Sequence, residues 1–265
     1  MYLSFTKYQG AGNDFIMIDN RKSVFPIIHR NNIIQQLCHR RFGIGADGLI
    51  LLEEDEEHDF KMVYFNADGN ESSMCGNGGR CIAAFARELN IIQNNAVFNA
   101  IDGKHEVELK SGTHVELHMK NVNHLETGPD TAVLNTGSPH YVVFVEDVSK
   151  INVVDLARKI RYNDQYTKDG INVNFAQWKD DHLLVNTYER GVEDETLACG
   201  TGITASALAW NELYKHEDIG DIKVKAKGGE LSVKFNKSGN EYTDIWLCGP
   251  AVKVFEGKVE LLVNV

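Results

Sequence analysis

The sequence predicts an α/β fold built as two similar halves, and three observations lead to that prediction. Short stretches in which apolar and polar residues alternate recur along the chain and indicate many β-strands. Two alanine-rich segments without proline, Gly78–Leu89 and Gly202–Tyr214, have the composition of helices. Each contains the end of a Cys-Gly-x-Gly turn, and the two turns, at Cys75 and Cys199, lie 124 residues apart.

The predicted strands are short, and many of them would bury one face. Glu106–Lys110 places Val107 and Leu109 on the same side, and a turn then leads to a second alternating stretch, so we expect a hairpin. Other strands are expected at Leu3–Tyr8, Leu49–Leu52, Phe60–Phe65, His140–Val145, Asn172–Ala176, Leu183–Tyr188, Lys223–Lys227, Leu231–Phe235, Tyr242–Leu247 and Val259–Val263. Two further helices are expected at Ile33–Arg41 and Val153–Arg161.

The residues that flank the two cysteines also match. Asn70–Gly78 and Asp194–Gly202 share, in order, an acid or amide, a glutamate, a hydroxyl residue and the Cys-Gly-x-Gly turn. A helix is predicted after each copy, which makes two unrelated glycine turns a poor explanation. The offset is close to half of the 265 residues, so we predict two related α/β domains, 1–122 and 123–265.

Composition limits the classes of function. The chain has 38 acidic and 27 basic residues and a net charge of −11, so nucleic acid is not expected as a partner. No apolar stretch has the length of a membrane helix, and the N-terminus lacks the pattern of a secretory signal. The five cysteines form no CxxC pair and no zinc-binding spacing, so we expect a cytoplasmic protein with reduced thiols and no metal.

A cysteine at a helix N-terminus has a specific chemistry. The helix dipole and unpaired backbone N–H groups favour the thiolate and can also bind a carboxylate. Two such helix ends could bind one carboxylate and place a sulfur on each face of the adjacent carbon. A thiolate could then remove a proton from one face while a thiol returns one to the other, which would invert the carbon without pyridoxal phosphate. Cys75 and Cys199 are therefore the predicted catalytic pair.

Other interpretations explain the cysteines less well. A cysteine nucleophile with a histidine base needs only one such residue, and a redox pair more often forms within one CxxC turn. Buried structural cysteine suits Cys38, Cys81 and Cys248. Gly43–Gly48 satisfies GxGxxG, but a helix precedes it and a strand follows, the reverse of a dinucleotide-binding turn.

At this point the motifs resemble those of the diaminopimelate epimerase family. The resemblance extends over nearly the whole chain, and the pair MCGNGGRC and ACGTG at this spacing is its most specific part. The matching segments are GAGNDF (10–15), FGIGADG (42–48), YFNADG (64–69), MCGNGGRC (74–81), NVNF (172–175), ERG (189–191) and ACGTG (198–202).

The resemblance implies a function and a set of site residues. It implies a cofactor-independent epimerase that converts LL-2,6-diaminoheptanedioate to the meso form, for lysine and peptidoglycan synthesis. Cys75 and Cys199 match the two catalytic cysteines, and His140 and Glu189 match residues that tune them or contact the amino group. The residues that match substrate-binding positions are Asn13, Asn66, Gly76, Asn77, Asn172, Glu189, Arg190, Gly200 and Thr201.

The resemblance also implies an architecture. Each of two pseudo-symmetric domains would curl its strands around a central helix, with the active site in the cleft between the domains and Leu261–Val265 returning to the first domain. Members commonly form homodimers, and Phe255 matches an aromatic position that contributes to the dimer in some members; packing in the core is the other expectation for this ring. This chain departs from the family at Ser138, where asparagine is frequent, and at Gly48, where some members have glutamine. Its 191–196 loop is one residue longer than in some relatives.

Two alternatives remain open from the sequence. A proline or hydroxyproline racemase shares the two-cysteine fold, but that family usually has histidine where this chain has Asn77, and it lacks the GNDF start. A noncatalytic amino-acid-binding protein would retain Asn66, Asn172 and Arg190 but would need neither cysteine.

Overall fold

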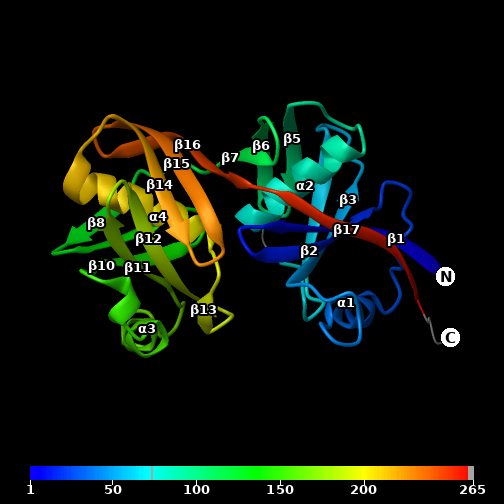
Figure 1. Ribbon diagram of the computed structural model, residues 1–265, viewed down its shortest axis with the longest axis horizontal. Helices are drawn as coiled ribbons and strands as arrows, with labels where there is room; N and C mark the ends of the chain where they lie inside the picture. Colours follow the sequence, from blue (N-terminus) through cyan, green and yellow to red (C-terminus); the bar gives the residue numbers. More distant parts are fainter. Residues whose placement is uncertain (73, 262–265) are drawn as a thin grey trace. The chain divides into compact units, whose positions relative to one another are not determined.

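The strands and helices of this protein are grouped into two units along the chain (Figure 1). The structure is a computed structural model that describes residues 1–72 and 74–261. Unit 1 comprises Met1–Leu117 and Pro250–Val265, of which 262–265 lie outside the described residues, and unit 2 comprises His118–Gly249.

Unit 1 contains a mixed sheet and two helices. Its elements are β1 (Tyr2–Gly10), β2 (Asn13–Asp19), α1 (Arg30–Cys38), β3 (Gly48–Glu53), β4 (Phe60–Asn66), α2 (Gly76–Glu88), β5 (Asn95–Ala100), β6 (Gly103–Leu109), β7 (His114–His118) and β17 (Val252–Glu260). β2 and β3 are parallel, β3 and β4 antiparallel, β4 and β5 parallel, and β5 and β6 antiparallel. β17, red in Figure 1, runs antiparallel beside β1.

The sheet of unit 1 is covered on both faces. Ile16, Leu49 and Val63 belong to the core on the α1 side. α2 lies on the other side, where a β-carbon at Gly78 would approach Ile50, Met62 and Phe15 at 3.0, 3.3 and 3.6 Å. This helix is buried from its first residue through Ala86 and contacts β1, β2, β3, β4 and β6, so the strands surround it.

Unit 2 repeats this order of elements. They are β8 (Leu125–Gly128), β9 (Thr131–Asn135), β10 (Pro139–Phe144), the 3-10 turn η1 (Val148–Lys150), α3 (Val153–Arg161), β11 (Asn172–Lys179), β12 (His182–Glu189), β13 (Asp194–Thr196), α4 (Gly200–Trp210), the π-helical turn η2 (Asn211–Lys215), β14 (Ile219–Ala226), β15 (Gly229–Ser238) and β16 (Glu241–Pro250).

The strand pairing of unit 2 has the same directions as that of unit 1. β10 and β11 are parallel, β11 and β12 antiparallel, β12 and β14 parallel, and β14 and β15 antiparallel. α4 contacts β9 to β12 and β14 and β15, and it is the counterpart of α2. The predicted fold class of two related α/β halves is therefore confirmed.

Some elements differ from the prediction. Both glycine-led helices begin two residues earlier than expected, immediately after the cysteines, because the glycines adopt helical conformation. β2, β5, β8, β9 and β13 were not predicted. β2 does not alternate because four successive residues, Phe15 to Ile18, are buried between two helices. The strand expected at Val259–Val263 begins at Val252 instead, and its last residues lie outside the described part.

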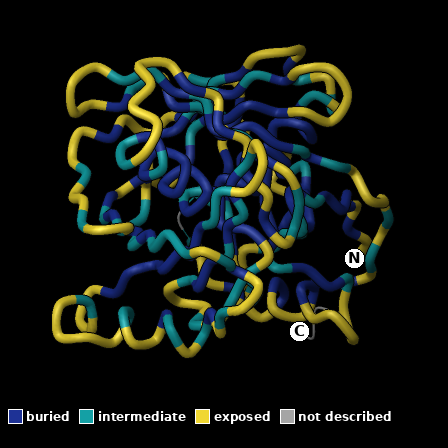
Figure 2. Tube along the Cα trace, turned by 60° about the vertical axis from the view of Figure 1, so that its left-hand side comes forward, coloured by how far each residue is buried: buried dark blue, intermediate teal, exposed yellow. Residues whose placement is uncertain are grey.

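The exposed part of the trace lies mainly in loops, and the buried part follows the two central helices and the strands against them (Figure 2). The expected return of Leu261–Val265 to the first domain concerns mostly residues outside the description. Leu261 itself packs in the unit 1 core and donates its backbone N–H to the Met1 carbonyl at 2.8 Å.

Candidate active site: two cysteine half-sites

Each predicted catalytic cysteine is the residue immediately before a central helix. Cys75 caps α2 with φ −100° and ψ 127°, and Cys199 caps α4 with φ −112° and ψ 112°. Their carbonyls accept the first helical hydrogen bonds, from Gly79 N at 2.7 Å and Ile203 N at 2.8 Å. Gly76 and Gly200 are therefore the first helical residues, whose N–H groups have no acceptor within an α-helix. The repeat thus places both sulfurs at equivalent helix N-termini.

In unit 1 Asn13, the first residue of β2, lies beside Cys75. Its Oδ1 accepts from Cys75 Sγ at 3.6 Å and from Asn77 Nδ2 at 3.4 Å. Its Nδ2 donates to Asp47 Oδ2, which fixes the orientation of the amide. Buried Arg80 donates to Asn77 Oδ1 at 2.8 Å and orients that amide in turn. Asn13 and Asn77 are thus brought together at Cys75, as a common site requires.

Asp47 belongs to an ionic cluster that sequence reasoning missed. Arg40 bridges Asp14 at 2.8 Å and Asp47 at 2.6 Å, and Lys7 contacts Asp14 at 2.8 Å. Burial opposes ionisation of Asp14, but the hydrogen bonds from Arg40 and Lys7 lower its pKa to about 2. The two aspartates occur in the GAGNDF and FGIGADG motifs, so the motifs held the signal for this cluster.

Asn66, predicted to bind substrate, lies exposed at the end of β4. It pairs with Gly48 across β3 and β4, and its backbone N–H donates to the Asn70 carbonyl at 3.0 Å. A β-carbon at Gly48 would lie 2.5 Å from the Phe65 carbonyl oxygen, so a larger residue there requires a shift of the backbone.

In unit 2 the neighbour of Cys199 is a hydroxyl. Cys199 is buried, and its Sγ lies 3.4 Å from Thr201 Oγ1. His140 Nε2 lies 2.8 Å from the same Oγ1, and Thr136 Oγ1 donates to the Thr201 carbonyl at 2.8 Å. The structure therefore brings together His140, Thr201 and Cys199, three of the predicted site residues.

His140 is completely buried and electrically neutral. Burial first, and the positive charge of Arg190 second, lower its pKa to about 3. Asn174 Nδ2 donates to His140 Nδ1 at 3.0 Å, and Thr187 Oγ1 donates to Asn174 Oδ1 at 2.9 Å. Asn174 and Thr187 were not predicted, although alternation along NVNF places Asn174 on the same face of β11 as Asn172.

The glycine at position 202 makes room for this group. A β-carbon there would lie 2.3 Å from Asn174 Oδ1 and 3.3 Å from His140 Cε1. Gly202 is buried, and the absence of a side chain there allows Asn174 and His140 to approach α4.

Asn172, a predicted substrate residue, connects three segments of unit 2. Its Nδ2 donates to Ser138 Oγ at 2.8 Å and to the Pro139 carbonyl at 3.0 Å. Its Oδ1 accepts from the Arg190 backbone N–H at 2.9 Å. Both amide hydrogens and the amide oxygen are therefore used within the protein.

Glu193 holds the loop that carries Glu189 and Arg190. Its carboxylate accepts from Arg161, from the hydroxyls of Tyr162 and Tyr188 at 2.8 and 2.9 Å, and from Gly191 N at 3.2 Å. Burial opposes ionisation, but these donors lower the pKa of Glu193 to about 2. Glu193 lies in the longer loop noted in the sequence, and nothing in a single sequence predicts this cluster.

Arg190 is exposed, as a residue that binds a ligand can be. Its Nη1 donates to the Asp169 carbonyl at 2.8 Å, which directs the guanidinium along the loop before β11. Of the other cysteines, Cys38, Cys81 and Cys248 are buried. Burial raises the pKa of the Cys38 and Cys81 thiols to about 12, which suits packing better than catalysis.

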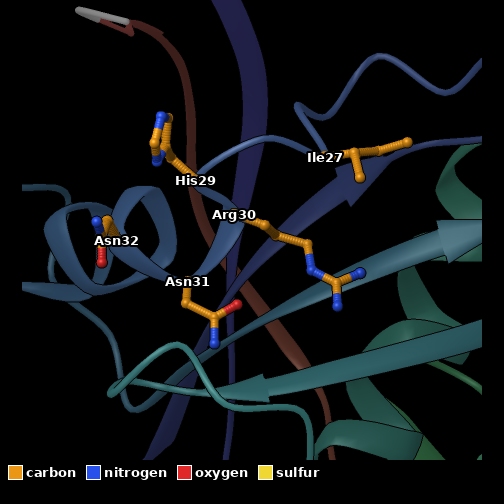
Figure 3. A pocket seen from close by; sticks show the side chains of 5 residues that line it. All are labelled: Ile27, His29, Arg30, Asn31 and Asn32. Carbon is orange, nitrogen blue, oxygen red and sulfur yellow. The ribbon is translucent and has the colours of Figure 1, made fainter. Parts of the chain in front are cut away.

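A hollow of about 330 Å³ lies at the start of α1, away from both cysteines in the sequence. It is lined by Ile27, His29, Arg30, Asn31 and Asn32. Figure 3 shows these side chains projecting in different directions, so they do not converge on one ligand position. None of the described helices is long and apolar enough to cross a membrane.

Comparison with known proteins gives close relatives at the level of sequence. The sequence pattern of the family described as "Diaminopimelate epimerase" matches residues 5–125 and 132–254. A diaminopimelate epimerase of Flavobacterium psychrophilum is 52% identical over 94% of this chain and 97% of its own length. One of Chlorobaculum tepidum is 43% identical over 95% of this chain and 99% of its own.

Solved structures show the same fold at low identity. A phenazine biosynthesis protein of the PhzF family from Bacillus anthracis has a TM-score of 0.75 and 15% identity, covering 98% of this chain and all of its own. A hydroxyproline epimerase from Agrobacterium vitis has a TM-score of 0.70 and 13% identity, covering 98% and 93%. These two support the fold, while the sequence matches are specific to one group. The chain belongs to the diaminopimelate epimerase family.

Proposed function

We propose that this protein epimerises LL-2,6-diaminoheptanedioate to the meso form, with Cys75 and Cys199 as its two acid–base groups. As a member of its family the chain is an isomerase. The observation that carries the residue assignment is the equivalence of the two cysteines, each at the N-cap of the central helix of its unit. A purely structural cysteine has no reason to recur at that position in both units.

The proposed reaction moves one proton off the α-carbon and another onto it. A thiolate removes the α-proton, and the C–H electron pair moves into the carboxylate as an enediolate. The thiol of the other cysteine then protonates the opposite face, and the electron pair returns to form the new C–H bond. The first cysteine ends as a thiol and the second as a thiolate. The mechanism requires both sulfurs to reach one carbon.

The N-termini of α2 and α4 would bind the reacting carboxylate. N–H groups at Gly76, Asn77, Gly200 and Thr201 would hold the reacting carboxylate and stabilise the charge that develops on it. No cofactor is included in the proposal, because preorganised amides can perform this task when water is excluded.

The remaining candidates would hold the rest of the substrate. Arg190 is exposed and suits a carboxylate, for which its planar guanidinium is well matched. Asn13, Asn66 and Asn172 would contact ammonium or carboxylate groups. Glu189 would lie near the reacting centre with His140. We also propose that the enzyme works in the cytoplasm as a homodimer and supplies lysine and peptidoglycan synthesis.

The test is proton exchange in heavy water. Purified protein with reductant and LL-diaminopimelate should form the meso isomer with deuterium at the inverted α-carbon, which mass spectrometry and NMR would detect. L-proline serves as the control substrate and should gain no deuterium. Absence of both exchange and epimerisation with diaminopimelate would contradict the proposal, and exchange with proline alone would favour the racemase alternative.

A further inference from the structure

The two sulfurs have hydrogen-bond neighbours of opposite kind. Cys75 Sγ faces the amide oxygen of Asn13, which can only accept a hydrogen bond. Cys199 Sγ faces the hydroxyl of Thr201, which can donate or accept. An acceptor stabilises a thiol, and a donor stabilises a thiolate. If Thr201 donates to Cys199 Sγ, these two contacts favour the thiolate at Cys199 and the thiol at Cys75.

The direction of that hydroxyl follows from a chain of buried groups in unit 2. Thr187 Oγ1 donates to Asn174 Oδ1, so the other end of the amide, a donor, faces His140 Nδ1. Because an amide nitrogen has no lone pair to offer, Nδ1 must be the accepting nitrogen. His140 is neutral, and its single ring proton is then on Nε2.

That proton points at Thr201. His140 Nε2 lies 2.8 Å from Thr201 Oγ1 and donates to it. The hydroxyl hydrogen of Thr201 is then left to donate to Cys199 Sγ at 3.4 Å. Three of these groups, His140, Asn174 and Thr187, have exposed fractions of 0%, 0% and 2%, so water does not compete for the bonds between them.

In unit 1 the group that faces the cysteine sulfur is held as a hydrogen-bond acceptor. Asp47 Oδ2 accepts from Asn13 Nδ2, and this holds Asn13 Oδ1 toward Cys75. Asn77 Nδ2 donates to the same Oδ1, while Arg80 donates to Asn77 Oδ1 and prevents that amide from turning over. Rotation of either amide would lose hydrogen bonds on both sides of it.

We propose that Asn174 and Thr187 are positioning residues that hold the proton of His140 on Nε2, so that Thr201 donates to Cys199. Cys199 is then the cysteine that rests as the thiolate, and Cys75 rests as the thiol. The catalytic meaning of this difference depends on the proposed epimerase function. After one turnover the proton positions are exchanged, and a further turnover in the same direction needs proton exchange with water to restore them.

The first test reads the tautomer of His140 directly and uses no substrate. Nitrogen-15 NMR of the imidazole rings distinguishes a protonated from a bare ring nitrogen, and the His140→Gln variant identifies the signals among the ten histidines. We expect wild type to carry the proton on Nε2. Asn174→Asp should move it to Nδ1, because the carboxylate accepts where the amide donated. A wild-type proton on Nδ1 would overturn the proposal.

The second test measures which of the two cysteines is a thiolate. Iodoacetamide alkylates thiolates, and peptide mapping by mass spectrometry gives a rate for each cysteine, so each site is compared with itself across variants. Asn174→Asp should slow alkylation of Cys199 about tenfold and leave Cys75 unchanged. In wild type the rate at Cys199 should persist to lower pH than the rate at Cys75. A Cys75 rate that persists to the lower pH would overturn the assignment.

Three further variants separate positioning from damage to the fold. Thr187→Ser keeps the hydroxyl and should behave as wild type, whereas Thr187→Val should mix the tautomers and slow Cys199 alkylation. Thr201→Val should leave the His140 proton on Nε2 yet still slow Cys199 alkylation, since only the final donor is lost. Unchanged alkylation of Cys199 in Thr201→Val would contradict the proposal. Failure of the heavy-water experiment would leave these substrate-free results unaffected, so the two claims fail separately.

Discussion

Two asparagines on one face of β11 serve different neighbours. Asn172 connects Ser138, Pro139 and the Arg190 backbone, and Asn174 connects His140 with Thr187. In both buried carboxamides the nitrogen and the oxygen each have a hydrogen-bond partner, which lowers the free-energy cost of burying such a group. At this scale the chemistry depends on which end of each amide faces its neighbour.

Buried neutral His140 gives a prediction about pH. Its pKa is lowered to about 3, so the unfolded chain, with a value near the ordinary 6.5, binds its proton first as pH falls. Its contribution to stability is complete above pH 6.5 and declines from there toward pH 3. Between about pH 7.5 and about pH 5 we expect it to lower the free energy of unfolding by about 2 kcal/mol.

The measurement is urea unfolding of wild type and His140→Gln at both pH values. From about pH 7.5 to about pH 5 the free energy of unfolding should fall less in the variant than in wild type, by about 2 kcal/mol. The same substitution at His124, which is exposed, is the control for removal of one histidine. Equal losses in wild type and in His140→Gln would show that His140 is not buried in its neutral form.

Only part of this residue-level arrangement could be predicted from the sequence. Cys75 and Cys199 could be predicted because each stands in a short glycine-rich motif that occurs twice in the sequence. Asn174, Thr187 and Glu193 were not, because their partners come from strands or loops distant along the chain. The assignments for Asn66 and Arg190 remain predictions that depend on family resemblance.

At the scale of elements, composition explains which helices and strands could be predicted from the sequence. The central helices were predicted because alanine and glycine mark them, and their starts were off because helical glycine resembles a turn in sequence. β2 was missed because a strand buried on both faces reads as a plain apolar run. Each central helix contacts several strands. The close packing against them explains why glycine stands at positions where a larger residue would collide with a neighbour.

The repeat offers a matched pair of substitutions at this scale. Gly78 and Gly202 are equivalent, but a β-carbon at 78 meets the flexible ends of Ile50 and Met62, whereas one at 202 lies 2.3 Å from Asn174 Oδ1. Gly202→Ala should destabilise the protein by about 1–3 kcal/mol and slow turnover. Gly78→Ala should be nearly neutral because alanine also favours the helix. Urea unfolding measures both, and an equal cost at the two positions would contradict this account.

The loop after β12 gives a second prediction for an element. Glu193 is the acceptor that orders this loop, and charge-assisted hydrogen bonds of this kind contribute about 1.5–3 kcal/mol each. Glu193→Ala should therefore raise the KM for diaminopimelate about tenfold with a smaller effect on kcat, because Arg190 is displaced. Glu193→Gln should raise the KM by a smaller factor.

Glu146→Ala, which removes an exposed carboxylate of the same unit, is the matched control for the loss of one charge. Steady-state kinetics on the three variants distinguish the cases. A Glu193→Ala enzyme with wild-type KM would show that the loop does not position substrate groups.

At the scale of the whole molecule, the same local arrangement occurs in two half-sites that differ in detail. Both units place a cysteine at a helix N-terminus, but an amide oxygen faces one sulfur and a hydroxyl faces the other. A reaction that takes a proton on one face and returns one on the other needs one base and one acid. In our proposal the different neighbours of the two cysteines supply that difference.

The proposed homodimer is also tested at this scale. Phe255 on β17 packs edge-on against Phe5 at 5.8 Å, yet 45% of it is exposed, and neighbouring Val254 is 54% exposed. Phe255→Asp should shift the mass in light scattering from two chains toward one. Ile219→Asp, at an exposed residue at the start of β14, is the control and should remain a dimer. A wild-type mass of one chain at all concentrations would contradict the dimer.

The most direct test of the central claim is epimerisation by single-cysteine variants. Cys75→Ala and Cys199→Ala should each lose conversion of LL-diaminopimelate to the meso form by at least about a thousandfold, because either change removes the acid or the base. Cys38→Ala, in the core of unit 1, is the control and should remain active. Near-normal conversion by either catalytic variant would contradict the two-base assignment.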